Sequence, residues 1–233
     1  MTYAVKYAII YTLSVKNRQV KITEKRIKSG LMINKLSISN SGYIRCESAL
    51  YTANDILDDS KVYELHKGIN LIEGDIDSGV WGISYLLSMF KYKVKPKLLL
   101  KPTVAQADGK TVSLKKLNEK SCYIDEKLYT LFKSKKSVIS LIKSGVKKSK
   151  NKASANDIID TFKLDMLRIQ KPVSLNEDER FKAMAAIGYA YGKEIFCFPW
   201  LSRKAYDYYS SKLDELSDIF KKLNCIIIIP VGR

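Results

Sequence analysis

Residues 66–90 read HKGINLIEGDIDSGVWGISYLLSMF and decide the fold. Gly68 turns the chain, and the apolar run over residues 69–73 is typical of a short buried strand. Residues 74–82 are punctuated by glycines, and residues 83–90 are apolar with a helical pattern. The stretch therefore predicts a strand, a loop and a helix in succession.

Short runs of β-branched and aromatic residues precede this stretch and predict antiparallel, half-exposed strands. Breaks at residues 16–18 and a turn at residues 40–42 separate these runs. They divide into an N-terminal β extension over residues 1–31 and a second strand region that follows it. The expected strands cover residues 3–15, 19–27, 32–39 and 43–51.

Strand and helix patterns alternate after this stretch. A hairpin is expected around the turn at residues 107–110. A helical lobe is predicted over residues 125–172, in which residues 147–152 form a lysine-rich connector. Parallel strands of an α/β core fit the last part best. The expected strands cover residues 97–100, 111–114, 121–124, 194–198 and 225–229, and the expected helices cover residues 137–144, 155–168, 178–191 and 206–223.

The composition is that of a folded protein with an unusual charge. Of the 233 residues 46% are hydrophobic, which is enough for one sizeable core, so residues 1–233 are predicted to form a single domain. Forty-one Lys and Arg against 24 Asp and Glu give a net charge of +17. This charge favours anionic partners such as nucleic acid, acidic lipid or an acidic protein. An AT-rich genome, which encodes Lys, Ile, Asn and Tyr heavily, explains the charge equally well.

The cysteines and the single histidine indicate neither a metal site nor a redox motif. The cysteines have no CxxC spacing, and His66 has no second histidine to join it as a ligand. The longest apolar stretch near the C-terminus, residues 225–230, is too short to span a bilayer. We therefore expect a cytoplasmic protein with reduced thiols, no bound metal and no transmembrane segment. The cysteines are Cys46, Cys122, Cys197 and Cys225.

The order of these segments resembles that of ATP-binding cassette (ABC) ATPase domains. Residues 74–81 read GDIDSGVW at the place of the P-loop of that family, which reads G-x-x-G-x-G-K-S/T. The resemblance covers nearly the whole chain from about Met32. It implies an α/β fold with a P-loop NTPase-like core of mostly parallel strands, an antiparallel β region and a helical lobe.

The P-loop position keeps its outer glycines but loses the groups that bind nucleotide. In a working P-loop, backbone N–H groups cradle phosphate, the Lys contacts the terminal phosphates and a hydroxyl binds magnesium. Val80 and Trp81 stand at the Lys and Ser/Thr positions and can do neither, and the carboxylates of Asp75 and Asp77 would repel a polyphosphate. Read without the family, residues 74–82 are an ordinary strand-to-helix turn. The resemblance implies a vestigial P-loop at Gly74, Ser78 and Gly79.

The catalytic positions of the family are replaced as well. Where the family has four apolar residues followed by Asp and Glu, residues 195–198 are followed by Pro199 and Trp200. The metal-binding carboxylate and the catalytic base are therefore both lost. After the last strand, Val231 or Gly232 stands where the family has its switch histidine. The resemblance thus implies no catalytic residue in this chain.

Two further motifs are altered. Glu126 would replace the Q-loop glutamine that senses the metal and the transport partner. Of the LSGGQ-x-Q-R signature only Ser174 and Arg180 remain. Read without the family, Ser174 and Glu177 form a capping box for the helix that follows, and we prefer this structural interpretation.

Three functions remain open. The first is a degenerate ABC ATPase-like protein that lacks ATP hydrolysis and acts as a binding or assembly module, with a protein partner or as a homodimer. The second is an ATP-binding ABC protein associated with a transporter, in which ATP is the cofactor and other contacts replace the P-loop lysine. The third is a basic nucleic-acid-binding protein. The lysines predicted to bind a partner are Lys143, Lys147, Lys148, Lys150 and Lys152.

Overall fold

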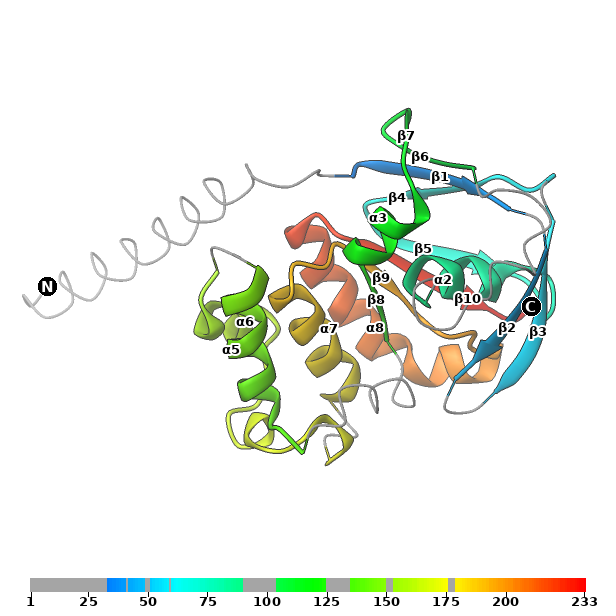
Figure 1. The fold of residues 1–233 in the computed structure, drawn as a ribbon. Coiled ribbons are helices and arrows are strands. Elements are labelled where there is room, and N and C mark those ends of the chain that lie inside the picture. The colour runs from blue at the N-terminus through cyan, green and yellow to red at the C-terminus, as the bar shows by residue number, and fades with distance from the viewer. Residues whose placement is uncertain are drawn as a thin grey trace, which may run out of the picture. The chain divides into compact units, whose positions relative to one another are not determined.

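A computed structural model describes residues 33–40, 42–48, 51–58, 60–89, 104–124, 135–149, 153–175 and 179–233 (Figure 1). Residues 33–233 group into one compact unit. The predicted N-terminal extension over residues 1–31 lies outside the described residues.

A four-stranded parallel sheet forms the centre of this unit, in the order β5-β10-β9-β8. The side chains of β10 alternate between two hydrophobic cores, because successive residues of a strand point to opposite faces. Ile227 and Ile229 belong to one core, and Ile226 and Ile228 belong to the other. The continuous apolar run of this strand therefore follows from burial on both faces. The strands are β5 (Gly68–Glu73), β8 (Ser121–Tyr123), β9 (Ile195–Cys197) and β10 (Ile226–Val231).

Helices cover both faces of the parallel sheet. One core contains α2 (Val80–Met89), which is buried at every position. The other core contains α7 (Arg180–Ala190) and α8 (Arg203–Leu223), and Figure 1 shows α5 and α6 beside α7. The remaining helices are α3 (Leu114–Lys120), α5 (Val138–Ser149), α6 (Ala155–Thr161) and the short 3₁₀ helices η3 (Arg168–Gln170) and η4 (Val173–Leu175).

Two antiparallel sheets complete the core that contains α2. One has the strand order β4-β1-β6-β7, and the other is the pair β2-β3, which packs against α2. Inward side chains such as Leu36, Ile44 and Leu57 join that core. The strands are β1 (Lys35–Ser39), β2 (Gly42–Glu47), β3 (Thr52–Leu57), β4 (Tyr63–His66), β6 (Val104–Ala107) and β7 (Lys110–Thr111). The parallel core, the antiparallel region and the helices expected from the sequence are all present.

Two predicted strands end earlier than expected. The strand expected over residues 43–51 stops at Glu47, because the chain turns where the Ser48 N–H donates to the Tyr51 carbonyl at 2.8 Å. Strand β3, which was not predicted, follows this turn. The strand expected over residues 111–114 is present as β7 but ends at Thr111, because Ser113 caps α3 by accepting from the Lys116 N–H.

Three predictions on helices and burial also need correction. The helix predicted over residues 155–168 ends at Thr161, where Lys163 takes the left-handed conformation with φ +49°. Helix α5 continues to Ser149, so part of the expected lysine-rich connector is helical. The strand expected to be buried over residues 69–73 lies at the edge of the parallel sheet, where Leu71 is 44% exposed.

None of the described helices is both long enough and apolar enough to cross a bilayer.

Candidate functional site

Residues 74–79, the predicted vestigial P-loop, form a tight, closed turn between β5 and α2. Its first N–H, that of Gly74, donates to the Val231 carbonyl at 2.9 Å, and both the N–H and the hydroxyl of Ser78 donate to the Asp75 carbonyl. Gly79 has φ +90°, and a Cβ there would lie 2.6 Å from the Ile56 carbonyl oxygen. The turn therefore requires glycine at residue 79 both for its conformation and for the close approach of β3.

A carboxylate from β3 occupies the N-terminus of α2. The Gly79 N–H donates to Asp55 Oδ1 at 2.6 Å, and the Gly82 N–H donates to Asp55 Oδ2. Asp55 is fully buried. The first N–H groups of a helix have no partner within the helix and attract anions. In this chain the Asp55 carboxylate occupies this anion-binding place at the start of the helix.

The strand pattern explains how Asp55 reaches these amides. Alternate residues of β3 point inward, so Asp55 and Leu57 face α2 while Ile56 is exposed. Gly82 makes the approach possible, because a Cβ there would lie 2.9 Å from Leu57 Cδ2 and 3.1 Å from Asp55 Oδ2. The Ile56 N–H also donates to the Asp77 carbonyl at 3.4 Å, so β3 is joined to the loop by its backbone. The sequence analysis missed Asp55.

Burial dominates the ionisation of this site. It raises the pKa of Asp55 to about 6, against the lowering effect of the Gly79 and Gly82 N–H groups, while the negative charge of Asp77 adds to the rise. Burial, followed by the charges of Asp55 and Asp58, raises the pKa of Tyr63 to about 12. The buried carboxylate is thus ionised at neutral pH, but only by a small margin.

The free energy of unfolding is expected to fall as pH rises through 6. The pKa of Asp55 is higher in the folded protein than the ordinary 3.8, so the folded state binds the proton more tightly. The stabilisation from this proton is complete below the unfolded value and disappears above the folded one. Between about pH 5 and about pH 7.5 the loss is on the order of 1 kcal/mol. Urea unfolding of the wild type and of Asp55→Asn checks this, because only the wild type should show this component.

The side chains of Val80 and Trp81, which the sequence predicts at the Lys and Ser/Thr positions of a P-loop, lie in the core. Trp81 is fully buried, and its Nε1–H donates to the Tyr123 hydroxyl at 2.8 Å. Tyr85 packs edge-on against Tyr123 with the ring centroids 5.5 Å apart. Val80 is buried as well. Because both side chains are buried, neither Val80 nor Trp81 can contact a ligand bound at the loop. Glu126, predicted at the Q-loop, lies outside the described residues.

Trp200 lies between the loop that begins at Gly74 and the ends of β9 and β10. Its Nε1–H donates to the Gly74 carbonyl at 3.0 Å, and a Cβ at Gly232 would lie 2.8 Å from its ring. Tyr51 packs edge-on against it with a centroid distance of 5.4 Å. An indole therefore fills the space between the loop, the end of β9 and the end of β10. The described residues contain no group of three or more His, Cys, Asp or Glu side chains that could hold a metal ion.

Comparison with known proteins identifies this architecture. No protein-family model matches the sequence, and no curated protein matches it. A solved ABC transporter ATP-binding protein from Pyrococcus furiosus matches 86% of this chain over 92% of its own, at 17% identity and a TM-score of 0.56. The chain has the ABC ATPase fold.

Two further structures with the ABC ATPase fold agree. The ATP-binding cassette MJ0796, solved as a dimer bound to ADP and Pi, matches 85% of this chain over 88% of its own, at 12% identity and a TM-score of 0.52. CbiO1 from Clostridium perfringens, part of the transporter complex cbiONQ, matches 85% over 78%, at 16% identity and a TM-score of 0.53. The fold class predicted from the sequence is thus confirmed.

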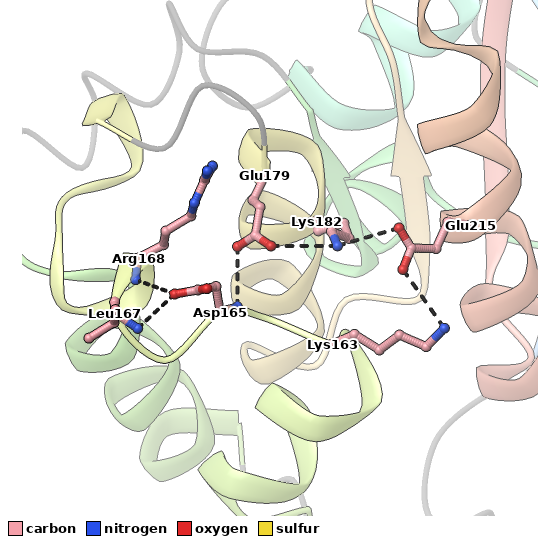
Figure 2. Close-up of polar contacts among 7 residues, drawn as sticks. All are labelled: Lys163, Asp165, Leu167, Arg168, Glu179, Lys182 and Glu215. Atoms are coloured by element: carbon pink, nitrogen blue, oxygen red, sulfur yellow. Dashed lines mark hydrogen bonds and ion pairs between the residues drawn. The ribbon is translucent and has the colours of Figure 1, made fainter.

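A chain of charges fixes the start of α7 (Figure 2). The Glu179 carboxylate accepts from the Asp165 N–H at 3.3 Å and lies 3.6 Å from Lys182 Nζ. Lys182 also contacts Glu215 of α8 at 3.4 Å, and Glu215 lies 3.8 Å from Lys163. These contacts join the chain after α6 to both α7 and α8.

Of the predicted capping box, Glu177 lies outside the described residues, and Ser174 is not the N-cap of α7. Ser174 lies in η4, where the Leu175 N–H donates to the Pro172 carbonyl at 3.0 Å, and the N-cap of α7 is Glu179. The local sequence favours a cap, but this 3₁₀ turn places Ser174 before the helix can begin. A capping box does form at the start of α6, between Ser154 and Asp157.

The structure brings together only part of the lysine cluster predicted to bind a partner. Lys143 and Lys147, four residues apart on α5, are exposed. The ammonium of Lys148 lies 5.9 Å from the ring centroid of Tyr191, just after α7. Lys150 and Lys152 lie outside the described residues.

Proposed function

We propose that this chain uses the ABC ATPase fold as a binding or assembly module and does not hydrolyse ATP. One observation carries the proposal: the Asp55 carboxylate accepts from the Gly79 and Gly82 N–H groups. Phosphate needs these groups, so nucleotide binding would require Asp55 to leave. Departure would expose a buried strand contact and break two charge-assisted hydrogen bonds.

The negative charges around the loop also oppose nucleotide binding. Asp75 and Asp77 flank the turn and are exposed. Two unit charges of like sign about 4 Å apart repel by about 4 kcal/mol where the effective dielectric constant is about 20. A polyphosphate would therefore meet repulsion in addition to competition from Asp55.

Hydrolysis would lack its usual chemical groups even if nucleotide bound. Phosphoryl transfer depends on positively charged groups and metal ions that neutralise the developing charge, and on a residue that positions the water. By the resemblance, the P-loop lysine and hydroxyl are replaced by Val80 and Trp81. The two carboxylates are replaced by Pro199 and Trp200. These replacements support a role without catalysis.

A protein partner or a second copy of the chain is the proposed binding partner. Among the structures that share the fold, MJ0796 was solved as a dimer and cbiO1 is part of a transporter complex. We propose a comparable assembly here, one that does not depend on ATP, and a cytoplasmic location, which the four free thiols support. Size-exclusion chromatography with light scattering, with and without MgATP, tests the homodimer.

MgATP is expected to leave the thermal unfolding of the protein unchanged. A ligand present at about ten times its Kd would stabilise the folded state by about 1.4 kcal/mol, which a thermal-shift titration detects readily. Titration to millimolar MgATP, with an ATPase measurement on the same sample, checks this.

Magnesium with AMP provides the matched ligand control, since it keeps the base and sugar but has no β- or γ-phosphate. A rise in melting temperature with submillimolar MgATP, absent with AMP, would overturn the proposal and favour an ATP-binding, transporter-associated protein. Phosphate release above the background of a mock-purified sample would contradict the absence of hydrolysis.

A further inference from the structure

Lysines gather where the parallel strands begin. Gly68, Ile226, Ile195 and Ser121 are aligned in register across the sheet and mark the first residue of each strand. A lysine directly precedes β5 and β8, another stands two residues before β9, and two end the helix that leads into β10. A further lysine, at the end of α5, lies over Tyr191 close to the start of β9. We call this set the basic edge; it consists of Lys67, Lys120, Lys148, Lys193, Lys221 and Lys222.

Side-chain contacts with the strand ends place these lysines along one side of the sheet. Lys221 lies against Gly68, whose Cβ would be 3.5 Å from Lys221 Cγ. Lys120 Nζ lies 2.6 Å from Glu194 Oε1, and Lys193 Nζ donates to the Glu119 carbonyl at 2.7 Å. Helix α5 is fixed beside α7, because the Ser149 hydroxyl donates to the Ala190 carbonyl at 2.7 Å. The basic edge is thus presented by rigid elements of the fold.

The acidic side chains near the basic edge are mostly engaged. Glu194 pairs with Lys120, and Asp218 lies 3.9 Å from Lys221. Asp108 accepts from the backbone N–H groups of Asn34 and Lys35. Complementing the negative ends of helices accounts for the lysines in the last turns of α3, α5 and α8, which are Lys120, Lys148, Lys221 and Lys222. It does not account for Lys67 or Lys193, which lie outside the helices.

The opposite end of the sheet carries the opposite charge. Figure 1 shows β10 running from the end of α8 toward the β2-β3 pair, where the vestigial P-loop lies. Glu73, Asp75, Asp77 and Asp58 lie at that end, and of these four only Glu73 is offset by an ion pair with another described residue, Arg203, at 2.7 Å. The sheet is therefore electrostatically polarised, and an anionic partner would be drawn to the strand beginnings and away from the P-loop.

We infer that the basic edge binds the phosphate backbone of a nucleic acid, without regard to its sequence. Adjacent strands lie about 4.8 Å apart, so the row of four strands spans about 14 Å, roughly four nucleotides of one strand of a duplex. Peripheral membrane segments combine basic residues with inserted apolar side chains. The large apolar side chains that are exposed in the described residues lie elsewhere, for example Ile56, Leu71 and Tyr208. The edge therefore fits nucleic acid better than a lipid surface.

Fluorescence anisotropy with a labelled DNA duplex of about 20 base pairs tests this inference. The wild type is expected to bind with an affinity that falls steeply between about 50 and 200 mM salt. The double variant Lys221→Gln/Lys222→Gln should bind about tenfold more weakly at about 100 mM salt, and the slope of log K against log salt should become shallower by about 2. The variant must keep the melting temperature of the wild type to within a few degrees.

The matched control is Lys143→Gln/Lys147→Gln, which removes the same charge from the exposed face of α5. It should bind the duplex nearly as well as the wild type, because neither residue belongs to the basic edge. Equal losses in both double variants would indicate a general charge effect and overturn the site, as would unchanged binding in the first. Cosedimentation with phosphatidylserine vesicles in the absence of duplex binding would overturn it in favour of a membrane surface. These outcomes do not depend on Asp55 or on ATP, so they are separate from the test of the proposed function.

Discussion

Replacing Asp55 with alanine is expected to lower the free energy of unfolding by about 3 kcal/mol at neutral pH. The change leaves the Gly79 and Gly82 N–H groups buried without their acceptor, and each such group costs about 1 to 3 kcal/mol. The N-terminus of α2 also loses its negative partner. Part of this loss is offset because a desolvated charge disappears. Denaturant unfolding, followed by circular dichroism, measures the difference.

Two further variants separate this effect from a general perturbation of β3. Asn54→Ala changes the exposed neighbour and should alter stability by less than about 0.5 kcal/mol. Asp55→Asn keeps the shape and one acceptor but turns an NH₂ group toward the second N–H, so it should lie between the wild type and Asp55→Ala. A loss below about 1 kcal/mol for Asp55→Ala would show that the α2 amides do not depend on this carboxylate.

The variant Trp81→Ser should destabilise the protein more than Asp55→Ala, lowering the free energy of unfolding by about 4 kcal/mol. It places a hydroxyl residue where the P-loop pattern has one, but it removes a fully buried indole and leaves a large cavity. It also removes the donor to the Tyr123 hydroxyl. Adding Val80→Lys, which completes the P-loop sequence, should destabilise the protein further, because that position is buried too.

Trp81→Phe is the matched control, since it keeps most of the apolar volume and loses only the indole N–H and part of the ring. It should cost about 1 to 2 kcal/mol by denaturant unfolding. If Trp81→Ser is no less stable than Trp81→Phe, the packing described here for Trp81 is wrong. Binding of MgATP by the Val80→Lys/Trp81→Ser protein would show that the two side chains alone had excluded nucleotide, with no part played by Asp55.

The parallel core could be predicted because its signals are local. Residues 226–229 are continuously apolar, as a strand buried on both faces requires, and α8 shows the spacing of an amphipathic helix. The turn at Asp108 and Gly109 likewise gave the hairpin of β6 and β7. The order of such segments was sufficient to indicate the fold.

The content of the site could not be predicted, because it depends on a contact between distant segments. Asp55 is 24 residues from Gly79 in sequence, and it lies in a strand, TANDIL, whose Asn and Asp are unfavourable for β structure. The one available signal was the two-residue alternation of a strand, which puts Asp55 on the same face as Ala53 and Leu57. The cap of α7 could not be predicted for a similar reason. Glu179, its N-cap, is held by Asp165 as well as by the nearby Lys182.

Asp55 is a ligand that the chain carries on its own strand. A group tethered beside its binding partners has an effective concentration far above that of most dissolved metabolites, so its occupancy of the α2 amides does not follow the supply of ATP. A ligand can move a domain between two shapes only through its different affinity for each, and one that never dissociates offers no such control. On the proposed function, the shape of this domain is therefore expected to be the same with and without ATP.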